Sequence, residues 1–219
     1  MKKAVWVLLL LCAHGGVFAL SGVLREKSGV VEIKPPGAVS FVPAKAGEPL
    51  TQDTVISTGF RSFAVIEIGH TSITVRPLTC LTLTEIQAAE EEETLAVNLQ
   101  AGRVRVDVKP PAGKKTSMSV SSPSATASVR GTSFEFDTRN LYVDSGKVSF
   151  MGNRGQSILV GAGGNSRVES NAKVTSPIEV KTSGLLPASP VGTEIAVGIP
   201  GGPYRVGVPF TIGLIFSRE

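Results

Sequence analysis

Short runs in which apolar and polar residues alternate are the feature of this sequence that most constrains its fold. Val104, Val106 and Val108 alternate with charged residues, and residues 64–68 repeat the pattern with Ala and Ile. A period of two is typical of a β-strand with one buried face. Aromatic residues make up only 5% of the chain, whereas Gly (24) and Pro (14) are plentiful, which favours short strands joined by frequent turns. The sequence therefore predicts a mainly β fold.

Three Gly-x-Val-x-apolar segments begin at Gly29, Gly102 and Gly146. The 73 and 44 residues that separate them are unequal, which argues against a regular solenoid with units of fixed period. Two architectures stay open from the residues alone, an irregular β-coil and a two-layer sandwich.

Turn signals between alternating runs predict local pairing. Ala101-Gly102 predicts a hairpin between residues 95–99 and 104–108, and Asp144-Ser145-Gly146 predicts another between 141–143 and 148–150. Residues 85–93, with four successive glutamates, are expected to form a solvated loop or a short helical turn, because like charges so closely spaced are unfavourable inside a sheet.

The first nineteen residues read as a secretory signal. Two lysines precede the apolar stretch Ala4–Cys12, and Val17-Phe18-Ala19 predicts cleavage after Ala19. The stretch is shorter than the ~20 apolar residues a membrane-spanning helix requires. Cys12 follows a leucine instead of a small residue, which disfavours lipoprotein processing. We expect a periplasmic or otherwise exported protein without a transmembrane helix after cleavage.

These observations divide the chain into a signal peptide (1–19), an all-β domain (20–164) and a Gly/Pro-rich tail (165–219). The length of 219 residues suits one domain plus a tail. Residues 195–197 and 210–216 have strand character and are candidates for late edge strands. The sequence does not predict the oligomeric state.

The residues give little support to enzymatic or metal chemistry. After signal removal His70 is the only imidazole and Cys80 the only thiol, too few for a catalytic triad or a zinc site. Losing two of 22 basic residues leaves 20 against 18 acidic ones, so the balance does not indicate nucleic-acid binding. We expect no enzyme activity and no cofactor.

The motif with the most information spans residues 122–134. Ser122-Pro123 is followed by Ala125-x-Ala127-x-Val129-Arg130-Gly131-Thr132-x-Phe134, with Leu99-x-x-Gly102-x-Val104 upstream and Val143-x-x-Gly146-x-Val148 downstream. This pattern resembles the FecR domain of bacterial envelope proteins over roughly residues 27–163. Its motif residues are interpreted as structural: Pro123, Val129, Arg130, Gly131, Thr132, Phe134 and Gly146.

The resemblance implies an exported domain that acts by binding, assembly or signalling in the cell envelope. Gly69-His70-Thr71 departs from the Asp-Gly-Ser turn common in the family, so the turn geometry there is expected to differ. The family's sigma-factor regulators add a cytoplasmic tail and a membrane helix that this sequence lacks, which puts direct sigma-factor signalling in doubt.

Two readings of Arg130 are open. Its planar guanidinium can recognise a carboxylate or phosphate, or it can bond carbonyl groups within the fold while Gly131 permits a bend; the second reading is preferred. Two functions are likewise open: a domain that presents sheet edges or loops to an envelope protein, and a peptidoglycan or carbohydrate binder with His70, Tyr142 and residues 109–115 lining the site.

Overall fold

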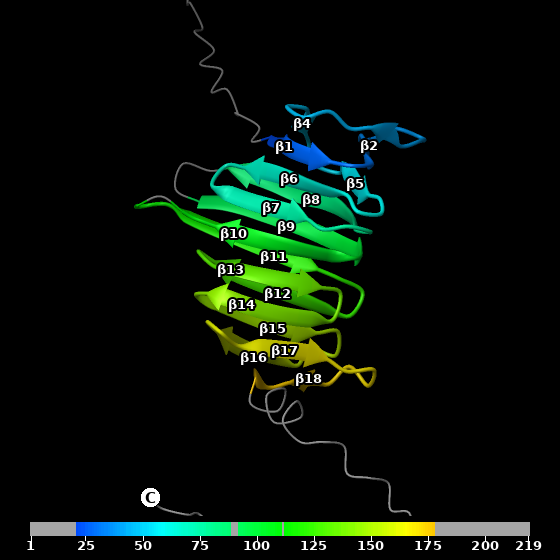
Figure 1. The fold of residues 1–219 in the computed structure, drawn as a ribbon. Coiled ribbons are helices and arrows are strands. Elements are labelled where there is room, and N and C mark those ends of the chain that lie inside the picture. The colour runs from blue at the N-terminus through cyan, green and yellow to red at the C-terminus, as the bar shows by residue number, and fades with distance from the viewer. Residues whose placement is uncertain (1–20, 89–91, 111, 178–219) are drawn as a thin grey trace, which may run out of the picture. The chain divides into compact units, whose positions relative to one another are not determined.

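The computed structural model describes residues 21–88, 92–110 and 112–177, all within one compact unit that ends at Leu185. These residues form two nine-stranded β-sheets (Figure 1). The predicted signal peptide, residues 1–19, and the candidate late strands 195–197 and 210–216 lie outside the described residues.

Sheet A consists of antiparallel strands throughout. In spatial order it contains β18 (Val174–Thr175), β17 (Asn165–Val168), β14 (Asn140–Ser145), β13 (Ser133–Asp137), β10 (Arg103–Val108), β7 (Thr71–Val75), β6 (Phe63–Ile68), β1 (Gly22–Ser28) and β4 (Pro49–Leu50).

Sheet B has one parallel pair, β9 with β11, among antiparallel neighbours. In spatial order it contains β16 (Ser157–Gly161), β15 (Lys147–Gly152), β12 (Ala125–Arg130), β11 (Lys115–Ser121), β9 (Glu92–Ala101), β8 (Cys80–Ala88), β5 (Val55–Thr58), β2 (Val31–Lys34) and β3 (Val42–Pro43).

The chain advances through both sheets nearly in sequence order, as the colour gradient in Figure 1 shows. It commonly makes one or two strands in one layer, crosses to the other layer, and continues beside the strands already laid down. The predicted mainly β fold is confirmed. Of the two open architectures, the two-layer sandwich describes the layers, and the irregular coil describes the path of the chain between them.

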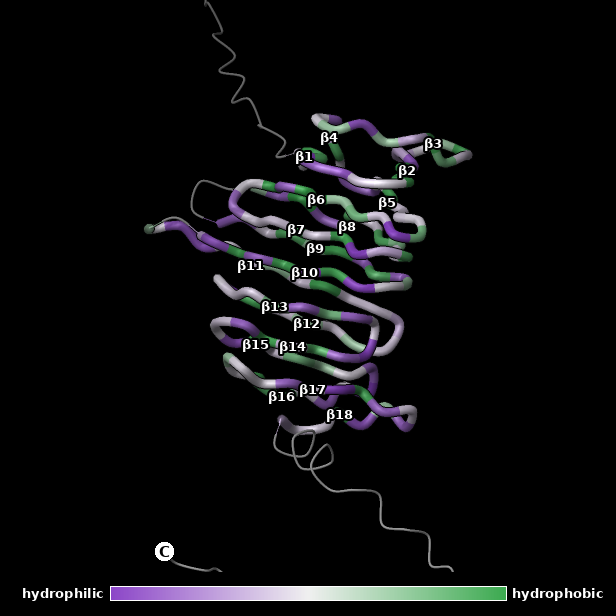
Figure 2. The backbone as a smooth tube through the Cα atoms, viewed as in Figure 1, coloured by the Kyte–Doolittle hydropathy of each residue, from purple (hydrophilic) through white to green (hydrophobic). Residues whose placement is uncertain are grey.

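The core lies between the two sheets, because alternate residues of each strand face inward. Figure 2 shows the resulting alternation of hydrophobic and hydrophilic residues along the strands. The largest buried side chains include Phe134, Phe136 and Phe150. Phe136 of sheet A and Phe150 of sheet B meet edge to face with 5.8 Å between ring centroids, so they join the two layers directly.

Both predicted hairpins are wrong in the same way. β9 and β10 flank Gly102, but β9 belongs to sheet B and β10 to sheet A. β14 and β15 flank Gly146 and are likewise divided between the layers. We call a turn that carries the chain from one sheet to the other an interlayer arch. A hairpin turn and an interlayer arch can both join two alternating runs through a glycine, so the local pattern does not distinguish them.

The expected loop at residues 85–93 is also wrong where the structure describes it. β8 continues to Ala88 and β9 begins at Glu92, with register shifts at the start of β8 and between Leu83 and Glu85. The Glu93 side chain is buried, and the Thr116 hydroxyl donates a hydrogen bond to its Oε2 at 3.4 Å. A polar partner inside the sandwich therefore accommodates a carboxylate that the charge pattern placed in solvent.

Sheet A continues beyond residue 164, the predicted domain end. β17 pairs with β14, and β18 pairs with β17, so residues 165–175 are part of the sandwich. The buried Ser166 hydroxyl donates to the Thr175 carbonyl at 2.7 Å and secures the β17–β18 turn.

The three glycines of the Gly-x-Val segments occupy equivalent interlayer arches. Gly29, Gly102 and Gly146 have φ of 71°, 91° and 80°, the left-handed region that side chains rarely adopt. A buried hydroxyl residue fills the space beside each glycine: Ser62, Thr79 and Thr132, respectively. A Cβ at Gly102 would lie 2.3 Å from Thr79 Oγ1 and 2.5 Å from Thr79 Cα.

Replacing Gly102 with alanine should therefore strongly destabilise the sandwich. We expect the free energy of unfolding to fall by about 2–5 kcal/mol, the sum of left-handed backbone strain and overpacking against Thr79. Urea denaturation followed by circular dichroism measures this change. Gly37→Ala is the matched control, since Gly37 has φ of 74° and open space around its Cβ position. It should lose only the backbone term, about 1–2 kcal/mol, and equal losses in the two variants would refute the close packing at Gly102.

Candidate functional site

Three neighbouring turns expose apolar side chains on one side of the sandwich. Val30, Phe60 and Leu78 are 62%, 72% and 61% exposed. They follow β1, β5 and β7 and lie together because the Gly59 N–H donates to the Val30 carbonyl (2.8 Å) and the Leu78 N–H donates to the Gly59 carbonyl (3.2 Å). We call Val30, Phe60 and Leu78 the turn ridge.

Buried hydroxyl groups fix the backbone beneath the turn ridge. The Ser62 hydroxyl accepts from the Val30 N–H at 2.8 Å and donates to the Phe60 carbonyl at 3.0 Å. Thr58 Oγ1 donates to the Arg76 carbonyl at 2.6 Å and accepts from the Thr79 N–H at 3.0 Å. These bonds hold the turns in one arrangement, which lowers the conformational entropy a partner would have to remove on binding.

The backbone at the turn ridge is also strained. Arg61 and Leu78 have φ of 53° and 56°, values that are uncommon for residues other than glycine. At Leu78 an apolar side chain therefore occupies both a costly backbone conformation and a solvent-exposed position. Arg61 lies over the Phe60 ring, with its guanidinium carbon 5.5 Å from the ring centroid, which adds a cation to the ridge.

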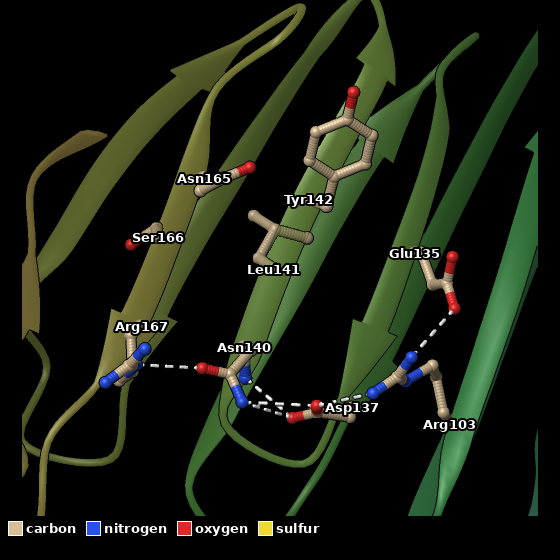
Figure 3. A pocket seen from close by; sticks show the side chains of 9 residues that line it. All are labelled: Arg103, Glu135, Asp137, Asn140, Leu141, Tyr142, Asn165, Ser166 and Arg167. Atoms are coloured by element: carbon tan, nitrogen blue, oxygen red, sulfur yellow. Dashed lines mark hydrogen bonds and ion pairs between the residues drawn. The ribbon is translucent and has the colours of Figure 1, made fainter. Parts of the chain in front are cut away.

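A hollow of about 710 Å³ adjoins Leu78. Arg76, Pro77 and Arg139 line it, together with Arg103, Glu135 and Asp137. A smaller hollow of about 300 Å³ shares Arg103, Glu135, Asp137 and Asn140 with it and extends to Tyr142 and Asn165 on the outer face of sheet A (Figure 3). The turn ridge and both hollows thus form one continuous surface.

Ion pairs cross the outer face of sheet A. Glu135 Oε1 lies 3.5 Å from the Arg103 guanidinium, and Asp137 lies 3.6 Å from the same group (Figure 3). Glu135 Oε1 also lies 3.8 Å from the Arg76 guanidinium. In the next row Arg105 lies 2.5 Å from Asp144. Arg–carboxylate pairs of this kind offset each other's charge.

Three arginines of this surface lack an acidic partner among the described residues. Arg61 stacks on Phe60, Arg139 lines the larger hollow, and Arg167 lines the smaller one, where its Nε donates to Asn140 Oδ1; none of the three forms an ion pair in the described part of the chain. The side of the sandwich that carries the turn ridge therefore presents unneutralised positive charge beside apolar side chains.

The motif residues surround an arch on another part of the sandwich. Val129 and Phe134 are buried in the core, Gly131 has φ of 62°, and the Thr132 hydroxyl donates to the Lys147 carbonyl at 3.2 Å while packing against Gly146. The Pro123 carbonyl accepts a hydrogen bond from the Asn153 side chain. These contacts hold strands and turns together.

Arg130 differs from its neighbours in the motif. Its side chain is 73% exposed and lies 4.0 Å from the Glu92 carboxylate on β9, while its backbone pairs with Ser117 of β11. An ion pair so exposed contributes little to stability.

The residues predicted to line a carbohydrate site divide between two places. Tyr142 lies on the outer face of sheet A beside Glu135 and Asn165 (Figure 3). The His70 carbonyl instead accepts from the Lys109 N–H at 3.1 Å, and neither hollow near Tyr142 is lined by His70 or by residues 109–115. Within the described residues, no cluster of three or more His, Cys, Asp or Glu side chains could hold a metal ion.

The turn ridge was not predicted from the sequence. Phe60 and Leu78 are apolar residues inside turns, out of phase with the alternation of the strands around them. That mismatch is the signal that could have drawn attention to them. Their proximity depends on the stacking of arches, which the sequence does not display.

The described residues define an all-β, two-layer domain in which glycine arches join the layers and polar ion pairs cover one face. In comparison with known families, residues 54–150 match the family described as FecR protein, so the predicted resemblance is confirmed over these residues. No curated protein matches the chain. The described residues contain no helix long and apolar enough to cross a membrane.

Two solved crystal structures are similar to part of the chain. Both are of a protein from Parabacteroides distasonis ATCC 8503 described as an anti-sigma factor, at 2.50 and 1.65 Å resolution. Their sequence identities to this chain are 18% and 15%, and both TM-scores are 0.46. Each match covers 55% of this chain and 57% of the solved chain, so only little more than half of either protein is compared.

Cys80 permits a test of the local structure of β8. Partial burial raises the pKa of its thiol, and Sγ donates to Gln100 Oε1 at 3.0 Å. We expect iodoacetamide to alkylate Cys80 several-fold more slowly in the folded chain than in urea at pH 8, because less thiolate is present. Because the pKa is raised, the alkylation rate of the folded chain should still be increasing at pH values above the ordinary thiol pKa, where the rate in urea has levelled off. A chain without residues 1–19 has Cys80 as its only cysteine, and equal folded and unfolded rates would contradict this environment.

Proposed function

We propose that this chain is an exported, non-enzymatic FecR-domain protein that acts in the cell envelope by binding another protein, for assembly or signalling. The observation that carries the proposal is the turn ridge. It combines three exposed apolar side chains, a backbone held by buried hydroxyl groups, and strain at Leu78. Exposed apolar side chains on a preorganised backbone are typical of protein-binding surfaces.

The charges beside the ridge favour a partner of particular chemistry. Arg61 and Arg139 lack acidic partners among the described residues and flank apolar side chains. A partner surface with apolar residues at its centre and acidic residues at its rim would complement both features.

Two further observations support the remaining parts of the proposal. The first nineteen residues have the composition of a secretory signal, which supports export. Glu135 and Asp137 are committed to arginine partners, and His70 lies at a turn away from both hollows, which supports a binding role over catalysis.

Replacing Phe60 or Leu78 with serine should weaken capture of the partner without unfolding the domain. Loss of one apolar anchor of this size costs about 1.5–3 kcal/mol of binding free energy, or roughly tenfold or more in affinity. The measurement is quantitative pull-down from envelope extracts with the immobilised chain, followed by mass spectrometry of the retained proteins.

Val39→Ser is the matched control, because Val39 is 96% exposed but lies in the loop between β2 and β3. It should retain the same proteins as the unmodified chain. Identical retention by the Phe60, Leu78 and Val39 variants would show that the turn ridge does not bind the partner.

A second candidate function, binding of peptidoglycan or another carbohydrate, is favoured by the smaller hollow. Tyr142 is half-exposed there, with Glu135 and Asn165 as its cross-strand neighbours and Asn140 hydrogen-bonded to Arg167 at 2.9 Å (Figure 3). An aromatic ring beside planar amide, carboxylate and guanidinium groups can stack on a sugar ring and bond its hydroxyl groups.

Tyr142→Ala distinguishes this second function from the first. If the hollow binds glycan, the variant should lose most of its retention on purified cell-wall material, since the stacking surface is gone. Co-sedimentation with insoluble peptidoglycan measures the retained fraction, and Phe60→Ser serves as the control with an intact hollow. An unmodified chain that remains in the supernatant would exclude the glycan function.

A further inference from the structure

The two sheets have four edges, and three of them are blunted. β3 and β4 contain two residues each, one of which is proline, and β18 also has only two residues. Proline lacks the N–H that an added strand would need, and a very short edge offers few pairing groups. These edges are poor templates for another strand.

The fourth edge, β16, has none of these protections, and within the described part of the chain no strand pairs with its outer side. Its five residues, Ser157-Ile158-Leu159-Val160-Gly161, include no charge and no proline. Leu159 is 64% exposed, and Met151, on the neighbouring strand, is 43% exposed. A long, uncharged, apolar edge promotes association unless something pairs with it.

The backbone of β16 is oriented for pairing. The Gly152 N–H donates to the Gln156 carbonyl at 2.9 Å, and hydrogen-bonded pairs recur at every second residue of an antiparallel ladder. Phe150–Ile158 and Val148–Val160 are therefore the pairs that face β15. Ser157 and Leu159 direct their N–H and C=O groups toward the open edge, as Gly161 does with its N–H. The Gly161 carbonyl instead accepts a hydrogen bond from the Gly164 N–H at 2.9 Å.

We propose that β16 pairs antiparallel with β16 of a second copy of this chain. The strand is self-complementary about Leu159: small residues, Ser157 and Gly161, lie at its ends, and β-branched residues, Ile158 and Val160, lie on either side of the centre. Around a two-fold axis Leu159 faces Leu159, and these two residues exchange backbone hydrogen bonds. Ser157 faces Gly161, whose N–H can donate to the Ser157 carbonyl while its own carbonyl stays bonded to the Gly164 N–H.

The side chains of the two copies are compatible in this arrangement. Leu159 and Met151 lie on the outer face of sheet B, so the two copies join four apolar side chains into one contiguous patch. No charged side chain of β16 opposes its symmetry mate. The two nine-stranded B sheets become one continuous sheet. The inward-facing Ile158, which is only partly buried against the core, becomes further buried beside the second copy.

Sedimentation equilibrium of the purified chain tests this dimer. We expect twice the mass of one chain, and Leu159→Lys should restore the mass of a single chain, because two lysines would meet at the two-fold axis. Val39→Lys is the control, with the same charge added at a distant exposed valine, and should remain dimeric. A single-chain mass for the unmodified protein, as would follow if residues 178–219 of the same chain covered β16, would overturn the proposal.

A covalent test reports the register directly. Facing residues of a hydrogen-bonded antiparallel pair have Cα atoms about 5.5 Å apart, within the range a disulfide bridges. Leu159→Cys, in a chain without residues 1–19 and with Cys80→Ser, should form a disulfide-linked dimer under mild oxidation. Val39→Cys in the same background should not. Absence of cross-linking by Leu159→Cys in a dimer of the unmodified chain would place the interface elsewhere and refute β16 pairing.

Discussion

The fit between a left-handed glycine and a buried hydroxyl at each arch is the constraint on which the sandwich depends. Gly29, Gly102 and Gly146 turn the chain from one sheet to the other, and Ser62, Thr79 and Thr132 occupy the space that a Cβ would need. The Thr79 hydroxyl also donates to the Arg103 carbonyl at 3.1 Å and accepts from the Arg103 N–H at 3.0 Å, so it anchors the strand that leaves the arch. Because successive arches set how the layers face each other, the core between the sheets follows from them.

The sequence predicted the strands well and their partners poorly. Alternating valines at 104–108 identify β10, since the inward face of a sandwich strand is apolar at every second position. The same alternation says nothing about which layer a strand joins, which is why the glycines at 102 and 146 indicated hairpins where the structure has arches. Burial of Glu93 escaped prediction for a related reason: its partner Thr116 lies 23 residues away on a parallel neighbour. The layer that a strand joins and the strands that it pairs with are both long-range properties.

The candidate site shows the same limit. Val30, Phe60 and Leu78 are separated by 30 and 18 residues, and they become neighbours only because arches stack one beside another. Once stacked, the turns share one set of buried hydroxyl bonds, so stability of the arches and rigidity of the turn ridge have the same physical origin. A surface of this kind can bind without ordering a loop first, which reduces the entropic cost of association. The ion pairs on the outer face of sheet A neutralise much of its charge, and among the described residues Arg61 and Arg139 leave positive charge beside the ridge.

Because the arches add strands in nearly sequential order, the first and last strands form opposite ends of the sandwich, and these two ends differ in their edge strands. At the end that contains β3 and β4, proline residues stop further pairing. At the other end β18 is short, but β16 is long and uncharged. The family match covers residues 54–150 and so ends within β15, before β16 begins. An explanation of the open edge must come from what this particular chain places against β16, because an unpaired edge of this composition is unfavourable for a protein that remains dispersed.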